Sequence, residues 1–245
     1  MKDDIPGPSS LEEEYEEVIL NANDFIVPKA PSTIRYIPNF INEEEEEYLL
    51  HRVETAPKPK WDFLKNRRLQ NWGGIVGKKS LIPDDEMPQW LEMMIEKIMR
   101  LENGFPEDHR PNHVLVNEYL PGQGIMPHTD GPAFFPLIST INLGGHTFLD
   151  FYEPIMGDDA KPLEERFIGS MFLEPRSLIL INENAYQLLH GIKERDLDAI
   201  NEKVFNRGDL PIGMELKRET TRVSLTIRNV PNVAKRSIMS LLKKT

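Results

Sequence analysis

The stretch TRVSLTIRNV, residues 221–230, alternates polar and apolar side chains. Because successive side chains of a β-strand point to opposite faces of the sheet, this period of two predicts a strand with one apolar and one polar face. The polar face would carry Arg222, Ser224, Thr226 and Arg228. A solvated edge strand explains such a row most simply. The alternative is an inward row that binds an anion, because a guanidinium group matches a carboxylate with two hydrogen bonds.

Similar stretches, rich in β-branched and aromatic residues, begin at about residue 113 and are separated by Pro, Gly, Asp and Asn. They are HVLVNEYL, LISTINL, TFLDFY, SLILIN and AYQLLHG. Two amphipathic helices are predicted before them. One lies within residues 40–57 and is opened by Asn42 as N-cap, and the other starts after Asp85 and Pro88 and stops at Gly104. Helices followed by short strands predict an α+β, mainly β fold: a jelly roll with N-terminal helices packed against the sheet. The polar segments 155–169 and 193–219 are interpreted as surface insertions.

The composition limits the classes of function. The chain has no cysteine, which excludes disulfides and thiolate ligands, so any metal must be held by histidine and carboxylate. A net charge of -11 argues against a protein that wraps a long nucleic-acid backbone. There is no run of about 18 apolar residues and no signal peptide. We therefore expect an intracellular protein of the cytoplasm, the nucleus or both, with no membrane contact.

The length of 245 residues favours one domain with tails. Residues 1–24 are acidic and are interpreted as a flexible leader. Residues 25–245 form the single predicted domain, and we expect a monomer. Its predicted parts are a helical region over 25–112, a β-strand core over 113–230 and a basic C-terminal extension over 231–245.

Two potential metal ligands, His128 and Asp130, lie two residues apart and would share one face of an extended segment. For a third ligand, His190 and His146 compete. His190 ends an apolar stretch just before a glycine, where a side chain can project into a cavity mouth. His146 is four residues from Asp150, a ligand spacing that suits a helix and not the strand predicted there. The remaining histidines, His51, His109 and His113, are interpreted as surface or strand-end residues.

Two histidines and one carboxylate on an open site match the facial triad of non-haem Fe(II) oxygenases. Zinc uses the same ligand types, so the identity of the metal stays open on these residues alone. A further polar pair, Asn117 and Tyr119, shares one face of a predicted strand. This pair offers an amide and a phenol as neutral hydrogen-bond donors.

Together these residues resemble a known family. The order NEYLPGQGIMPHTD, then His190, then RVSLTIR is similar to the AlkB family of Fe(II)- and 2-oxoglutarate-dependent dioxygenases. The signature of that family is Asn-x-Tyr, His-x-Asp, a distant His, and Arg-x-(Asn or Ser)-x-x-x-Arg. The match covers roughly residues 113–230. Further stretches, such as RLQNWGG, HTFLDFYEP and LEPRSL, are most similar to one branch of the family.

The resemblance implies a double-stranded β-helix, a variant of the jelly roll, with Fe(II), the cosubstrate 2-oxoglutarate and O2, and with ascorbate as reductant in vitro. The implied iron ligands and catalytic residues are His128, Asp130 and His190. The implied 2-oxoglutarate ligands are Arg222, Ser224 and Tyr119 for the distal carboxylate, and Arg228 with Asn117 for the carboxylate beside the keto group. Ser224 replaces an asparagine of the bacterial founding member, and both side chains offer a donor. The implied reaction yields succinate and carbon dioxide and hydroxylates a substrate C–H bond.

In that family, the segment before the catalytic core forms a lid over the substrate base. Residues 58–79 of this chain contain seven basic side chains and one acidic side chain. Aromatic residues among arginines suit stacking on an unpaired base. Anchoring of the lid to the core explains the aromatic residues equally well. The candidate lid residues are Trp61, Phe63, Lys65, Arg67, Arg68 and Trp72.

We therefore expect oxidative demethylation of alkylated or methylated nucleic acid, with short or single-stranded DNA or RNA as the partner. Two alternatives stay open. One is an oxygenase or demethylase that acts on a protein side chain, which the acidic net charge allows. The other is a non-catalytic protein that binds the cosubstrate without using it.

Overall fold

The computed structural model describes residues 19–31, 33–84, 86–155 and 161–235. Most of the predicted acidic leader and of the C-terminal extension lies outside these residues. Among the described residues, no helix is long and apolar enough to cross a membrane.

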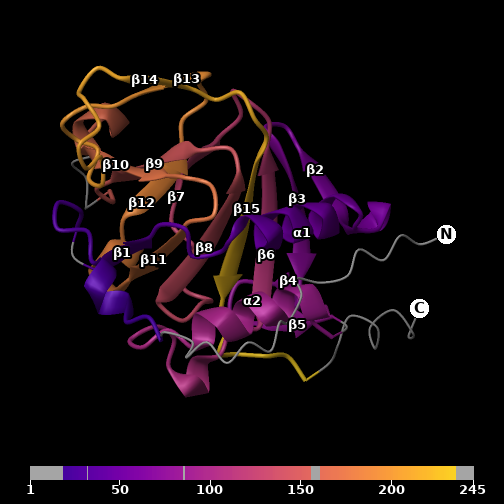
Figure 1. The fold of residues 1–245 in the computed structure, drawn as a ribbon. Helices are drawn as coiled ribbons and strands as arrows, with labels where there is room; N and C mark the ends of the chain where they lie inside the picture. Colours follow the sequence, from indigo (N-terminus) through magenta and orange to yellow (C-terminus); the bar gives the residue numbers. More distant parts are fainter. Residues whose placement is uncertain (1–18, 32, 85, 156–160, 236–245) are drawn as a thin grey trace.

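Two antiparallel β-sheets form the body of the protein (Figure 1). The larger, the major sheet, has the spatial order β1 (Ile34–Ile37), β11 (Leu178–Asn182), β8 (Leu137–Gly144), β15 (Arg222–Arg228), β6 (His113–Tyr119), β3 (Arg67–Trp72) and β2 (Trp61–Leu64). The smaller, the minor sheet, has the order β10 (Phe167–Leu173), β9 (Thr147–Tyr152), β12 (Leu189–Ile192) and β7 (Ile125–His128). Two-stranded ribbons pair β13 (Leu197–Ala199) with β14 (Glu215–Lys217), and β4 (Gly74–Val76) with β5 (Leu81–Pro83). The prediction of a mainly β, antiparallel fold is confirmed.

Strand β15, which contains the alternating stretch, lies in the middle of the major sheet between β8 and β6. The simplest explanation of its polar row, a solvated edge strand, is therefore wrong. Three of the four polar residues are buried, with exposed fractions of 5% for Arg222, 3% for Ser224 and 6% for Arg228, and Thr226 is partly buried. On the opposite face, Leu225 and Ile227 are fully buried. Both faces of this strand therefore lie in the interior of the protein, and the buried donors on its polar face require hydrogen-bond acceptors.

Two helices cover the outer face of the major sheet, α1 (Glu43–Glu54) and α2 (Gln89–Met99) (Figure 1). Leu49 of α1 and Ile95 of α2 belong to the same buried cluster as Leu225 of β15. Both predicted helices are confirmed, with slightly shorter bounds. Short helical turns are η1 (Ala22–Phe25), η2 (Lys58–Lys60), η3 (Glu107–His109), η4 (Leu163–Arg166) and α3 (Glu183–Tyr186).

Helix α1 begins with a capping box, as the predicted N-cap Asn42 indicates. The Glu45 amide donates to Asn42 Oδ1 at 2.8 Å, and the Asn42 amide donates to Glu45 Oε2 at 2.9 Å. Replacing Asn42 with alanine leaves the Glu45 amide without this acceptor, so we expect the free energy of unfolding to fall by about 1 kcal/mol in urea titrations. Glu47→Ala, an exposed site on the same helix, serves as the control and should change stability by less than about 0.5 kcal/mol. Equal stability of Asn42→Ala and wild type would contradict the role of the cap.

Part of the predicted strand AYQLLHG is helical, because α3 ends at Tyr186 and β12 begins only at Leu189. A short apolar run fits a buried helical turn as well as a strand, and tertiary contacts decide between them. Ala185 is fully buried, and the Tyr186 hydroxyl donates to the Gly131 carbonyl oxygen.

The prediction of two surface insertions is also partly wrong. Strand β10 begins inside the first of them, and residues 156–160 lie outside the described residues. The second contains the β13–β14 ribbon and buries Ile200 and Val204 against Phe148 of β9. These few apolar residues pack onto a distant strand, a contact that the local polar composition does not reveal.

Candidate active site

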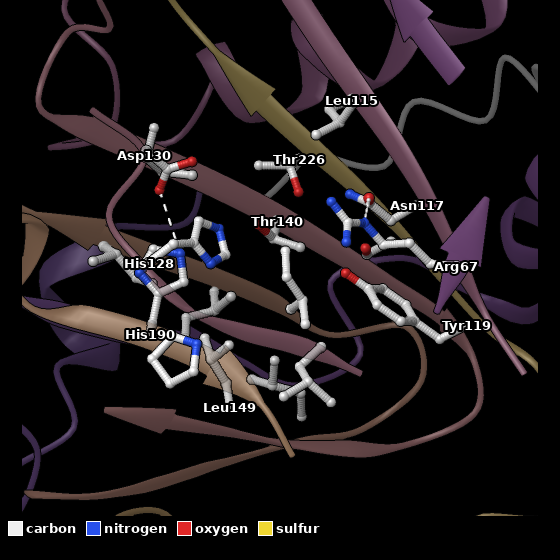
Figure 2. A pocket seen from close by; sticks show the side chains of 18 of the residues that line it. Arg67, Leu115, Asn117, Tyr119, His128, Asp130, Thr140, Leu149, His190 and Thr226 are labelled. Carbon is white, nitrogen blue, oxygen red and sulfur yellow. Dashed lines mark hydrogen bonds and ion pairs between the residues drawn. The ribbon is translucent and has the colours of Figure 1, made fainter. Parts of the chain in front are cut away.

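A cavity of about 510 Å³ lies between the major and minor sheets. Strands β6, β8, β11 and β15 of the major sheet line one side, and β7, β9 and β12 of the minor sheet line the other. Figure 2 shows histidines and an aspartate at one end and an asparagine, an arginine and a tyrosine at the other. The lining contains all eight residues predicted for iron and 2-oxoglutarate: Asn117, Tyr119, His128, Asp130, His190, Arg222, Ser224 and Arg228.

The three predicted metal ligands lie at one end of the cavity (Figure 2). His128 at the end of β7 pairs in register with His190 on β12, and the two ring centroids are 4.8 Å apart. Asp130 follows β7, and its Oδ2 lies 3.5 Å from His190 Nε2. Its other oxygen accepts a hydrogen bond from Arg228 Nη1 at 2.8 Å.

Within the described residues, no three His, Cys, Asp or Glu side chains are arranged closely enough to hold a metal ion as they stand. One Asp130 oxygen lies 3.5 Å from His190 Nε2 while the other is paired with Arg228. The three side chains are nevertheless of the kinds that bind Fe(II). His128, Asp130 and His190 supply two imidazoles and one carboxylate from neighbouring backbone positions at one end of the cavity.

Electrostatics favour a neutral imidazole at His190. Burial lowers the pKa of His190 to about 4, against the opposing effect of the Asp130 carboxylate. At neutral pH the ring therefore carries no charge and keeps a lone pair, which is the form that binds metal. The nearby guanidinium of Arg228 is also buried, and burial lowers its pKa while Asp130 opposes that change.

The other end of the cavity is built by β15 and β6, whose residues pair directly, Arg222 with Tyr119 and Ser224 with Asn117. Nη2 of Arg222 donates to Asn142 Oδ1 at 2.6 Å, while its Nε and Nη1 have no partner among the described residues. Burial lowers the pKa of Arg222 to about 10, so the side chain stays charged at neutral pH. Buried donors without acceptors are costly, and an anionic ligand removes that cost.

Tyr119 and Asn117 complete this end with neutral donors. Burial raises the pKa of Tyr119, so its hydroxyl stays protonated at neutral pH. The Arg222 guanidinium lies 5.5 Å from the centre of the Tyr119 ring. Asn142 of β8 was not among the predicted site residues. The signal that could have found it is an amide inside a predicted apolar strand, LISTINL.

The predicted lid residues lie on the hairpin of β2, which is an edge strand of the major sheet, and β3, which pairs with β6. They divide into two groups. One group makes structural contacts, in agreement with the anchoring alternative. Trp61 is buried under the Arg68 guanidinium at 4.0 Å, Arg68 pairs with Glu118, and Trp72 packs edge-on against Trp90 at 5.7 Å.

The other group remains available to a ligand. Phe63 is 74% exposed, and Lys65 is exposed beside it. Arg67 lines the cavity next to Asn117. Of the six candidate lid residues, Phe63 and Lys65 are exposed and Arg67 lines the cavity.

The remaining histidines lie outside the cavity lining. His146 lies 3.7 Å from Asp198, and Asp150 instead accepts a hydrogen bond from Ser170 at 2.6 Å. His113 begins β6, which confirms its predicted place at a strand start, but it is only 1% exposed and therefore lies in the interior. Burial lowers its pKa to about 3, with Arg228 acting in the same direction.

Comparison with known proteins identifies the same family as the sequence motifs do. The family model described as the 2OG-Fe(II) oxygenase superfamily matches residues 72–228. A zebrafish (Danio rerio) protein named "Probable RNA/DNA demethylase ALKBH6" is 44% identical over 226 residues, which are 90% of this chain and 95% of that protein. Protein L905 of Acanthamoeba polyphaga mimivirus is 30% identical and covers 79% of this chain and 83% of its own length. A 2OG-Fe(II) oxygenase-family oxidoreductase from Burkholderia pseudomallei has a similar fold, with a TM-score of 0.51, 9% identity and coverage of 84% and 88% of the two chains.

Proposed function

Because the chain belongs to the 2OG-Fe(II) oxygenase superfamily of enzymes, we propose that it oxidatively demethylates nucleic acid, with Fe(II), 2-oxoglutarate and O2 bound in the cavity between the sheets. The branch indicated by the sequence, AlkB homologue six, is that of the zebrafish relative. The observation that carries the proposal is the cavity, which has a potential metal site at one end and buried arginine donors without acceptors at the other. We propose further that the two sheets are the halves of a double-stranded β-helix.

In the proposed site, His128, Asp130 and His190 hold the iron from one side. Bound Fe(II) and 2-oxoglutarate supply the oxidising power, as 2-oxoglutarate and O2 are converted to succinate and carbon dioxide while a substrate C–H bond is hydroxylated. If that bond belongs to an N-methyl group, the product releases formaldehyde. The neutral His190 is ready to bind without losing a proton.

The remaining site residues bind and orient the cosubstrate. Arg222, with Ser224 and Tyr119, would bind the distal carboxylate of 2-oxoglutarate, because their donors converge at one end of the cavity. Arg228 would bind the carboxylate beside the keto group. The sequence predicts Asn117 for the same carboxylate, but Asn117 lies beside Tyr119 at the other end of the cavity (Figure 2), so we propose that it binds the distal carboxylate. Arg228 already contacts Asp130, so it lies next to the proposed metal site.

The nucleic-acid substrate is supported by the printed name of the zebrafish relative and by the hairpin of β2 and β3. The exposed Phe63 ring and the Lys65 ammonium group lie on this hairpin, close to Arg67 in the cavity lining. An aromatic face beside a positive charge suits an unpaired base and its phosphate. So small a set of contacts fits a short or single-stranded ligand, in line with the acidic net charge of the chain.

Succinate formation tests the proposal. Purified protein is supplied with Fe(II), ascorbate and 2-oxoglutarate, with and without methylated DNA and RNA oligonucleotides, and succinate and formaldehyde are measured. We expect succinate in all mixtures, with stimulation and formaldehyde release when a methylated oligonucleotide is present. Turnover that responds only to protein extracts would assign a protein substrate instead. Binding of 2-oxoglutarate without any succinate would assign a non-catalytic role.

Replacement of Phe63 by alanine tests the contact with a base. We expect the affinity for a single-stranded methylated oligonucleotide to fall about tenfold, because stacking on one aromatic side chain contributes on the order of 1–3 kcal/mol per base. Fluorescence anisotropy gives the dissociation constants. Ile212→Ala, at a similarly exposed apolar residue before β14, is the control and should bind normally. Normal binding by Phe63→Ala would remove this side chain from the interface.

A further inference from the structure

Arg67 enters the cavity from β3, the strand next to β6. Its Nε donates to Asn117 Oδ1 at 3.1 Å. Figure 2 shows the Arg67 guanidinium beside the Asn117 amide and close to Tyr119, at the end of the cavity away from His128. The next residue, Arg68, instead pairs with Glu118. Of these two adjacent arginines, Arg67 is therefore the one directed to the proposed cosubstrate site.

The contact decides which way the Asn117 amide faces. A guanidinium group has only donors, so the atom that receives its hydrogen bond must be the amide oxygen. With Oδ1 held by Arg67, the Nδ2 group of Asn117 is the end left for the cavity. An amide turned the other way would present its oxygen to a carboxylate and repel it.

The side chain of Arg67 is not required to hold the two strands together. Strands β3 and β6 already pair along a ladder from Arg68 and Glu118 to Trp72 and Val114. Among the described residues, the only hydrogen-bond partner of the Arg67 side chain is Asn117. A contact with one amide at the cavity wall is what a positioning role requires.

We propose that Arg67 is a positioning residue that orients the Asn117 amide, so that Nδ2 of Asn117 donates to a carboxylate of 2-oxoglutarate. This inference rests on the proposed function, because it takes 2-oxoglutarate as the ligand of this end of the cavity. It assigns to an arginine of the predicted lid a role in cosubstrate binding.

Two substitutions of Arg67 distinguish the effect of its hydrogen bond to Asn117 on 2-oxoglutarate affinity from the effect of its positive charge. In Arg67→Gln, Nε2 of glutamine is as many bonds from Cα as Nε of arginine, so it can still donate to Asn117 Oδ1. In Arg67→Met, a chain of similar length has no donor. Both variants lack the positive charge, so the difference between them reports the hydrogen bond.

The measurement is calorimetric titration of 2-oxoglutarate into protein loaded with Mn(II), which allows binding to be followed without turnover. We expect Arg67→Met to bind about tenfold more weakly than Arg67→Gln, as one hydrogen bond to a well-placed donor is lost. Wild-type affinity in Arg67→Met would overturn the proposal, as would equal weakening in both variants.

An Asn117→Leu background tests whether Arg67 acts through the amide. Without an amide to orient, Arg67→Gln and Arg67→Met should bind 2-oxoglutarate equally, because coupled residues give non-additive effects. A persistent difference would mean that Arg67 acts through another group and would overturn the proposal.

Arg35→Met is the matched control. Arg35 also donates to an asparagine, Asn182 Oδ1 at 2.8 Å, but it is absent from the lining of the cavity between the sheets. This variant should bind 2-oxoglutarate like the wild type. If wild-type protein itself fails to bind 2-oxoglutarate, the proposed function fails. If the wild type binds and the Arg67 variants are indistinguishable from it, only the present inference fails.

Discussion

Replacing Asp130 with asparagine is expected to reduce iron-dependent succinate formation by at least about a hundredfold. Loss of groups that merely support metal ligands already costs 10–100-fold in affinity or activity, and Asp130 supplies the only carboxylate among the three proposed ligands. Asparagine keeps an oxygen that accepts the hydrogen bond from Arg228 Nη1, which lies 2.8 Å from the aspartate in the wild type. The fold should therefore persist, and Mn(II) affinity should fall together with turnover.

Asp130→Ala is the less specific test of the same site. It leaves Nη1 of the buried Arg228 without the carboxylate and without any acceptor in its place, and breaking such a pair costs about 3–5 kcal/mol, whereas asparagine keeps an acceptor. Urea unfolding of the two variants separates the two effects, because only the alanine variant should be strongly destabilised. Wild-type succinate formation by Asp130→Asn would refute the metal assignment.

Replacing Arg222 with methionine is expected to have effects of opposite sign on binding and on stability. The dissociation constant for 2-oxoglutarate should rise about a hundredfold, since the proposed charge-assisted hydrogen bonds to the distal carboxylate are lost. The free energy of unfolding without cosubstrate should rise by about 1 kcal/mol. The reason is that Nε and Nη1 of Arg222 are buried without partners, and an apolar side chain of similar volume avoids that cost.

Arg218→Met provides the contrast in stability. Arg218 is buried as deeply as Arg222, but it pairs with Asp198 through Nε at 2.7 Å and Nη2 at 2.8 Å. Its loss leaves a buried carboxylate with fewer partners, so unfolding free energy should fall by about 3 kcal/mol. If Arg222→Met is destabilised as strongly as Arg218→Met, then the Arg222 guanidinium is already well paired in the protein without cosubstrate. The proposal that its free donors bind the carboxylate of a ligand would then be wrong.

Strand phase made much of the cavity predictable from the sequence. Asn117 and Tyr119 are two apart on β6, and Arg222 and Ser224 are two apart on β15, so each pair had to share a face. The cross-strand register then brings the two pairs together. The spacing alone does not tell which face of the sheet lines the cavity or what binds there. Those predictions came from the family resemblance.

Residues whose neighbours are distant in the sequence were harder to predict. Trp61 and Phe63 lie two apart in the same predicted lid, yet one is buried and the other exposed. Arg67 enters the cavity because β3 pairs with β6, about fifty residues further along the chain. The burial of His113 likewise depends on packing beside β15 and not on its polar surroundings in the sequence. The residues next to these positions in the sequence do not indicate any of these long-range contacts.

The one-to-one register between β15 and β6 also constrains how this chain can change during evolution. Substitutions at single positions of β15 alter one contact each, whereas the insertion or deletion of one residue between Arg222 and Arg228 would turn one of these arginines to the helix-covered face. Both arginines can face the cavity only if their separation along the sequence stays an even number of positions. Changes in chain length are accommodated at the connecting loops, where no strand partner fixes the phase.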